Sequence, residues 1–266
     1  MSSSIWMQCE GDSKRSALRL VAWRVVESQH EVSTRKLVSS AAEQELLEEL
    51  IDLVKPPVVV GARLHYLLFT PFRYPPLRYG SRFGTRHDRG IWYGSEQQRT
   101  AFAEVAYYRL LFLAGTQATL EPLSTALSSF TVRMRTTRGI DLAAPPFTTH
   151  AAHISSPASY QASQALGRAM REAQVELFRF SSARDADGGT NIGAFSPAVF
   201  HHATPQHFER WHCSASRSAV DFTRGDLTRT RAAHLFERAQ FLVRGQLPCP
   251  AQCASTGTAP ITSGSA

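Results

Sequence analysis

The sequence predicts an α+β fold, in which a mixed sheet of short strands packs with helices. Short apolar or alternating runs, such as residues 129–136, are interleaved with helical patterns, such as residues 95–114. No regular repeat of strand, helix and strand connects them, which favours the α+β class. The chain has 266 residues, of which 43% are hydrophobic and 10% aromatic, and this suffices to bury a core.

The ends of the chain differ in composition from its middle. Residues 1–15 are polar and are expected to be disordered, and residues 16–27 fit the periods of both a strand and a helix. The run from Ser40 to Glu43 is a capping box, which predicts a helix that stops before Pro56. Pro, Ser, Thr and Ala dominate the C-terminal tail, which is expected to be disordered. The expected parts are an N-terminal extension (1–55), a main domain (56–246) and a tail (247–266).

Three strands and one helix are expected around the first half of the main domain. Residues 64–72, LHYLLFTPF, are an apolar run containing a proline near its end and are expected to form a strand. Residues 91–93 are a short aromatic strand broken by Gly94, and the apolar positions after it recur at helical spacing up to Ala114. Residues 129–136 alternate apolar and polar side chains, which indicates a further, half-buried strand.

The second half of the domain has both helix and turn signals. Ser156-Pro157 combines a capping residue with proline at the first helical position, so a helix is expected from there to about Ala173. The turn signal Asp187-Gly188-Gly189 separates two expected strands. These strands cover residues 175–180 and 191–195, further strands are expected within 211–222, and a last helix is expected over 230–243.

Basic residues are in excess, with 29 Lys and Arg against 22 Asp and Glu, and the formal net charge is +7. Most of the basic residues are Arg, which binds phosphate and carboxylate bidentately. The charge therefore fits a nucleotide ligand, an acidic protein partner or nucleic acid. A genome that encodes Arg in place of Lys produces the same excess, so the charge alone does not choose among them.

Cysteine and histidine do not form a recognisable metal motif. Four cysteines lack the close spacing of a zinc site and are expected to be free thiols in a reducing compartment. The cluster of His201, His202 and His207 lacks an accompanying carboxylate motif, and no metal is predicted. The N-terminus does not have the pattern of a signal peptide and no apolar run reaches the length of a membrane span, so a cytoplasmic location is expected. The cysteines are Cys9, Cys213, Cys249 and Cys253.

The strongest candidate site lies in residues 79–114. Arg82 falls in a turn bounded by glycines, Tyr93 in the short aromatic strand and Glu104 inside the apolar helix. A carboxylate among apolar residues is expensive unless it meets a cation or a ligand. Glu104 is therefore either a site residue or a structural partner of Arg109 or Arg82. The motifs GxGxxG, GxxxxGK[ST] and GxSxG are all missing from the sequence.

Two ordered blocks resemble the RES domain, a family of bacterial toxins from toxin–antitoxin pairs that is named after an Arg, a Glu and a Ser. The first block contains Arg82-Phe83-Gly84, Tyr93 and the run AFAEV around Glu104, and the second is FSSARDADGGTN, which contains Ser182. The resemblance covers roughly residues 60–215. It departs from the family at Gly84, where Asn is frequent, and at Phe180, where Tyr is usual.

The resemblance implies a fold similar to that of the ADP-ribosyltransferases and cleavage of NAD+ at the nicotinamide–ribose bond. Glu104 would stabilise the positive charge that develops on the ribose, and Ser182 would orient the ribose or an incoming phosphate. Arg82 would hold the pyrophosphate and Tyr93 would stack on nicotinamide or ribose. NAD+ would be the substrate, with phosphate or water as the acceptor, and no cofactor is expected. Further substrate-binding candidates are Arg184 and Asn191.

The resemblance also implies a partner, an Xre-like antitoxin with a helix-turn-helix. Contact with a membrane or directly with nucleic acid is not expected, and the oligomeric state stays open, a homodimer included. Two other functions stay open as well: a mono-ADP-ribosyltransferase that acts on a macromolecule, and a basic nucleic-acid-binding module. On local sequence, Ser182 fits a turn cap equally well, and Arg184 fits a structural pair with Asp185.

Overall fold

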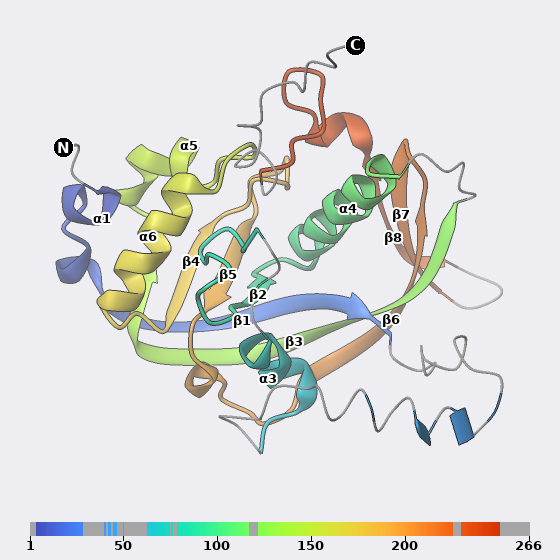
Figure 1. Cartoon of the computed structure of the whole chain (residues 1–266), viewed down its shortest axis with the longest axis horizontal. Coiled ribbons are helices and arrows are strands. Elements are labelled where there is room, and N and C mark those ends of the chain that lie inside the picture. Colours follow the sequence, from blue (N-terminus) through green and yellow to red (C-terminus); the bar gives the residue numbers. More distant parts are fainter. Residues whose placement is uncertain are drawn as a thin grey trace, which may run out of the picture.

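The computed structural model describes residues 4–28, 63–74, 79–116, 122–225 and 230–250, together with position 76 and several positions between 40 and 50. They form an α+β fold in which eight strands make one mixed sheet, which confirms the predicted class (Figure 1). The strands are β1 (Ser16–Glu27), β2 (Trp92–Ser95), β3 (Leu123–Asp141), β4 (Leu177–Ser181), β5 (Thr190–Ala194), β6 (Gln206–Ala215), β7 (Ala219–Gly225) and β8 (Thr230–Glu237). The helices are α1 (Ile5–Gln8), α3 (Tyr66–Arg73), α4 (Gln98–Ala114), α5 (Ala151–Ile154) and α6 (Gln161–Glu172).

The strand order is β1-β2-β5-β4-β3-β6-β7-β8, and β1 pairs with β3 as well, so the first five strands of this order close into a ring. The pairing of β3 with β4 is parallel and the other pairings are antiparallel. The register of β1 and β3 runs from Ser16 opposite Gly139 to Glu27 opposite Leu127. The strands β1, β3 and β6 are longer than the short strands that the sequence suggested.

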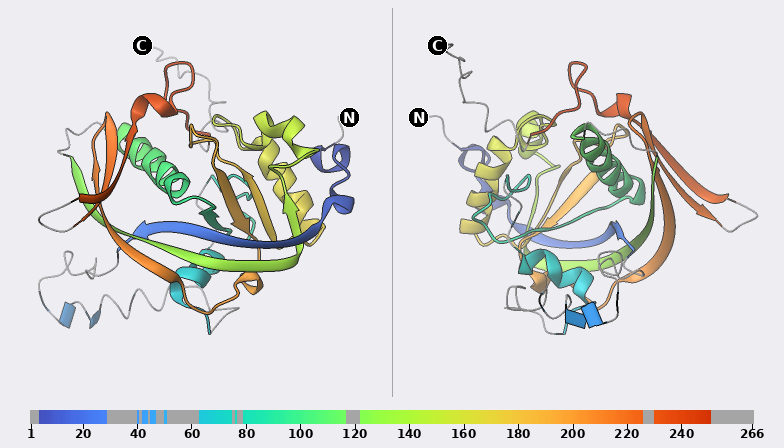
Figure 2. Two further views of the ribbon diagram at one scale, coloured as in Figure 1. Left: turned by 180° about the vertical axis from the view of Figure 1, so that it is seen from behind. Right: turned by 45° about the vertical axis from the view of Figure 1, so that its right-hand side comes forward.

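The helix α4 lies inside the curve of these long strands, with α6 towards one end of the sheet and β7 and β8 towards the other (Figures 1 and 2). Its apolar side chains face several strands, which explains why they surround most of its circumference. Phe102 is fully buried against Trp211 and Phe222, with ring centroids 4.6 and 4.7 Å away. The predicted buried helix is therefore confirmed.

The disorder expected for residues 1–15 is not found in the described part of that segment, because residues 5–15 pack on the fold, and residues 16–27 take the strand form of the two that the sequence allowed. Trp6 in α1 is 6% exposed and packs in the same cluster as α6, and β1 lies between β2 and β3 in the sheet. The Ser40 side of the capping box is present, since Ser40 Oγ accepts a hydrogen bond of 3.2 Å from the backbone N–H of Glu43. The described positions from 42 to 50 are helical, and the rest of that predicted helix lies outside the described residues.

Two segments have a different secondary structure from the one predicted. Residues 64–72 were expected to be a strand, but the helix α3 takes up most of them, because Leu67, Leu68 and Phe72 share one helical face that packs on the core. Residues 230–243 were expected to be a helix but form β8 and a short 3-10 turn. There, hydrogen bonding to the edge of β7 overrides the local pattern.

The other differences concern the limits of elements. The helix expected from Ser156 begins at Gln161 instead, because Ser156 Oγ accepts hydrogen bonds from the N–H groups of Ala158 and Ser159 and so closes a separate turn. The beginning of the expected tail is packed, since Tyr107 donates a hydrogen bond of 2.6 Å to the carbonyl of Pro248. Residues 251–266 lie outside the described part. Among the described helices, none is long and apolar enough to cross a membrane.

Candidate functional site

The carboxylate of Glu104 is held by two hydrogen bonds from other parts of the chain. Its Oε1 accepts one of 2.8 Å from Ser182 Oγ and one of 2.5 Å from Asn191 Nδ2. Within the described residues Glu104 makes no ion pair, since Arg109 pairs with Glu27 and Arg82 donates to backbone carbonyls. The structural alternative for Glu104, a buried salt bridge with Arg109 or Arg82, is therefore wrong.

The loop after β4 orients the hydroxyl of Ser182. The backbone N–H groups of Arg184 and Asp185 donate to Ser182 Oγ at 3.1 and 3.2 Å. Because both donors occupy the lone-pair side of this oxygen, its own proton is directed to Glu104. Ser182 is thus a turn cap and a partner of the carboxylate at the same time.

The amide of Asn191 on β5 is fixed in one orientation. Its Oδ1 accepts a hydrogen bond of 2.6 Å from Ser95 Oγ on β2, which leaves Nδ2 to donate to Glu104. Asn191 is 5% exposed, and a buried amide with both ends bonded does not rotate freely. The pairing of β2 with β5 places Ser95 directly opposite Asn191 and thereby sets this contact.

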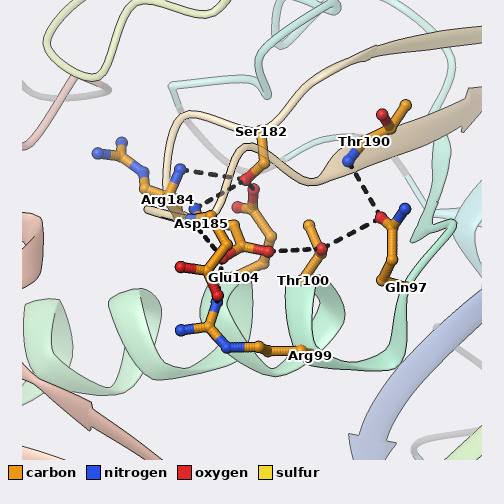
Figure 3. Close-up of polar contacts among 9 residues, drawn as sticks. Gln97, Arg99, Thr100, Glu104, Ser182, Arg184, Asp185 and Thr190 are labelled. Atoms are coloured by element: carbon orange, nitrogen blue, oxygen red, sulfur yellow. Dashed lines mark hydrogen bonds and ion pairs between the residues drawn. The ribbon is translucent and has the colours of Figure 1, made fainter.

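A second network ties the first turns of α4 to the same loop (Figure 3). Asp185 is 8% exposed, accepts a hydrogen bond of 2.7 Å from Thr100 Oγ1 and forms an ion pair with Arg99. Gly189 packs so closely that an added Cβ would lie 2.0 Å from Thr100 Oγ1. This network holds the loop that carries Ser182 against the helix that carries Glu104. Sequence reasoning missed it, because its members are distant along the chain.

Glu104 borders a cavity of about 360 Å³, which is within the range of about 300–1,000 Å³ typical of small-molecule sites. The candidates Arg82, Tyr93 and Asn191 line the same cavity. Ser182 and Arg184 are not among the described residues that line it, and Ser182 lies behind the carboxylate. The remaining lining residues are Trp23, Arg24, Val25, Ser81, Gly94, Ser95, Ala101, Val105, Tyr108, Tyr160 and Phe180.

Arg82 and Tyr93 are both held firmly in the wall of this cavity. Arg82 is 8% exposed, donates from Nη1 to the carbonyl of Ser156 at 2.8 Å and lies 4.9 Å over the ring of Tyr160. The Tyr93 hydroxyl accepts from the N–H of Phe83 at 3.2 Å and lies 3.0 Å from Ser81 Oγ. Burial raises the pKa of Tyr93 to about 12. Part of the Arg82 guanidinium is thus hydrogen-bonded to the backbone. The sequence had suggested a guanidinium with both terminal nitrogens available to a ligand.

Arg184 lies away from the carboxylate, and its side chain points away from Glu104 in Figure 3. Its guanidinium donates to the carbonyl of Pro157 at 3.0 Å and lies 3.5 Å over the ring of Tyr107. The expected structural pair of Arg184 with Asp185 is also wrong, because Asp185 pairs with Arg99. The structure thus brings five of the six candidate residues together and places Arg184 outside the group.

Arg24 on β1 lines this cavity and was missed by sequence reasoning. The reason is that residues 1–55 were assigned to an extension. A signal was present all the same, because in a strand Arg24 falls on the same face as the apolar residues Ala22 and Val26. A cation at such a position indicates a buried or functional role in the same way that Glu104 does.

The arrangement can stabilise positive charge on a bound ligand through one oriented carboxylate, and it offers a phenol and guanidinium groups beside it. Within the described residues, no group of three or more His, Cys, Asp or Glu side chains could hold a metal ion. The fold and the cavity thus define an α+β protein with a cavity that is bordered by an oriented carboxylate. A family model, the RES domain, matches residues 56–215, and the chain belongs to this family. Comparison with curated proteins gives no match.

Membership of the RES domain family is consistent with an enzymatic, NAD-related function of the toxin type. The match includes four of the elements that build the cavity wall, namely β2, α4, β4 and β5. It does not include β1, although β1 supplies Trp23, Arg24 and Val25 to the cavity. The site is therefore completed by a strand that precedes the matched region.

Proposed function

We propose that this protein cleaves NAD+ at the bond between nicotinamide and ribose, with phosphate or water as the acceptor. The observation that carries the proposal is the carboxylate of Glu104, which borders a cavity without an ion-pair partner among the described residues. Breaking this bond leaves the bonding electrons on nicotinamide and gives the ribose oxocarbenium character. A fixed carboxylate stabilises such a cation more in the transition state than in the bound substrate.

The two oxygens of Glu104 have different tasks in this proposal. Both hydrogen bonds from Ser182 and Asn191 go to Oε1, and no described residue donates to Oε2. Oε2 is therefore the oxygen that faces the ribose, where it accepts a hydrogen bond from a ribose hydroxyl and lies close to the developing positive charge. Ser182 and Asn191 act as positioning residues that keep this oxygen in place.

The remaining wall residues bind the substrate. Tyr93 presents its ring in the cavity wall, where it limits the space beside the ribose, and Arg82 lies next to it. The acceptor oxygen, from phosphate or water, then forms the new bond to the ribose carbon, and a water acceptor gives up a proton. The products are nicotinamide and either ADP-ribose phosphate or ADP-ribose.

The test is incubation of purified protein with NAD+ in the presence and absence of phosphate, with nicotinamide release followed by chromatography. We expect release without any macromolecular acceptor, and the effect of phosphate identifies the acceptor. Radioactive label that passes from NAD+ to a protein or nucleic acid would instead support the mono-ADP-ribosyltransferase. A folded protein that releases no nicotinamide and transfers no label would refute both activities and leave the nucleic-acid-binding module.

The proposed activity also requires control, because an enzyme that drains NAD+ stops the growth of its own cell. We therefore propose an antitoxin partner of the Xre-like type, encoded next to this protein. Expression of the protein alone should arrest growth, the Glu104→Gln variant should not, and co-expression of the neighbouring gene should relieve the arrest. Growth that is equal with the wild type and with Glu104→Gln would contradict this proposal.

A further inference from the structure

A second and larger cavity adjoins the one at Glu104. It measures about 800 Å³ and shares several wall residues with the first cavity, so the two cavities are adjacent. Helix α3, strand β2, helix α4 and the segment before α6 all contribute to its wall. The shared residues are Arg24, Ser81, Tyr93, Tyr108 and Tyr160.

All seven tyrosines of the chain line this larger cavity. Tyr107 and Tyr160 are buried in its wall and Tyr93 is partly buried, whereas Tyr66, Tyr74, Tyr79 and Tyr108 are 42%, 38%, 36% and 54% exposed. Exposed rings that gather around one hollow are typical of a ligand site rather than of a core. A tyrosine ring stacks on the flat face of a nucleobase whatever the base is. The seven tyrosines are Tyr66, Tyr74, Tyr79, Tyr93, Tyr107, Tyr108 and Tyr160.

A positive charge without a carboxylate partner marks the junction of the two cavities. Arg24 lines both of them, its Nη1 is buried without a hydrogen-bond partner, and its guanidinium lies 5.0 Å over the ring of Trp92. No ion pair involves Arg24 within the described residues. Glu27 also lines the larger cavity, but it is paired with Arg109. A guanidinium with a buried, unpaired nitrogen is costly and favours an anion at this point.

We propose that the larger cavity binds the adenosine half of a dinucleotide, with the pyrophosphate beside Arg24 and the nicotinamide–ribose bond at Glu104. This inference rests on the proposed function and specifies its substrate class, a dinucleotide rather than a mononucleotide or a nucleoside. Four of the tyrosines line only the larger cavity, Arg24 lines both and Glu104 lines only the smaller one, which matches the order of base, pyrophosphate and reacting ribose. Arg24 takes over the role that sequence reasoning gave to Arg82, whose Nη1 is bonded to the backbone.

The test compares three substrates that contain the same scissile bond: NAD+, nicotinamide mononucleotide and nicotinamide riboside. For the wild type we expect kcat/KM to fall in this order. Arg24→Ala should raise KM for NAD+ and for the mononucleotide by roughly 10- to 100-fold, because it removes one charged contact, and should leave the riboside unaffected. Arg19→Ala is the matched control, because Arg19 lies on the opposite face of β1 and lines neither cavity.

The rings are tested with the double variant Tyr66→Leu/Tyr74→Leu. It should lower kcat/KM for NAD+ by roughly 10-fold or more, since stacking on one ring is worth about that much, and should leave the two smaller substrates unchanged. The corresponding double Phe variant keeps the rings and should behave like the wild type. Equal cleavage of NAD+ and mononucleotide by the wild type, or an equal loss for all three substrates, would overturn the assignment.

Binding of AMP, measured by calorimetry, separates this inference from the proposed function. If the wild type cleaves none of the three substrates but binds AMP, and the double Leu variant does not, the proposed function fails and the adenosine site stands. If AMP does not bind to the wild type, or binds equally to the double Leu variant, the adenosine site fails whatever the protein cleaves. Circular dichroism and thermal unfolding confirm that each variant is folded.

Discussion

Replacement of Glu104 by Gln is the sharpest test of the site, because it changes the charge and very little else. The carbonyl oxygen of Gln occupies the place of Oε1 and continues to accept from Ser182 Oγ and Asn191 Nδ2. The amide nitrogen then replaces Oε2, which no described residue contacts, so no donor meets another donor within the described part of the site. The variant loses the negative charge at the one atom that we place next to the ribose.

The size of the effect follows from this geometry. One oriented electrostatic group typically contributes about 10²–10³ to kcat, so nicotinamide release should fall by about that factor. Stability should change by only about 1 kcal/mol, because two hydrogen bonds to a charged acceptor become bonds to a neutral one while a half-buried charge disappears. By contrast, Glu104→Ala leaves the buried Asn191 amide without its acceptor, and should destabilise the protein by about 1–3 kcal/mol.

The assay is nicotinamide release at saturating NAD+, together with urea unfolding of each variant. Glu96→Gln is the control, since Glu96 pairs with Arg179 and lines neither cavity. It should retain the activity of the wild type. A Glu104→Gln protein that is folded and turns over NAD+ at the rate of the wild type would refute the role of the carboxylate, whatever the other variants do.

Three further changes test the surroundings of Glu104. Ser182→Ala should lower kcat roughly 10-fold with little change in KM, because it removes a hydrogen bond that positions the carboxylate. Ser182→Thr should recover part of the loss, and a change in KM alone would contradict this role. Gly189→Ala should cost about 1–3 kcal/mol of unfolding free energy in urea, since its Cβ would lie 2.0 Å from Thr100 Oγ1; unchanged stability would show that the loop yields. Burial raises the pKa of Tyr93 from 10.0 to about 12, so the folded state keeps a proton that the unfolded state loses and stability falls between these pH values. Tyr93→Phe should make that fall shallower by up to about 1.4 kcal/mol per pH unit, and an identical slope would contradict the assignment.

Much of the site was visible in the sequence because its signals are local. The helix of Glu104 has apolar residues around its circumference, so one acid among them stands out whatever the fold is. Turn and strand signals likewise marked Arg82 and Tyr93. The α+β class followed from short runs of different period, and the order of two blocks indicated the RES domain family, whose model matches residues 56–215.

Local signals failed where tertiary contacts compete with them. Residues 64–72 are apolar enough for a strand or a helix, and packing of one helical face decides for α3. Residues 230–237 form a strand because their backbone hydrogen-bonds to the edge of β7. The short runs before β1 have few local signals, and burial of Trp6 against elements far along the chain makes them part of the fold.

The sequence by itself determined the fold class, the helix of Glu104 and most members of the candidate site. Only the tertiary structure decided which groups hold the carboxylate, because Ser182 and Asn191 lie 78 and 87 positions from it and are brought there by the order of the strands. It also decided that Arg24 belongs to the cavity and Arg184 does not, since a side chain's surroundings depend on which elements pack beside it. Local pattern specifies periodicity and charge, and the sheet determines which of those charges meet.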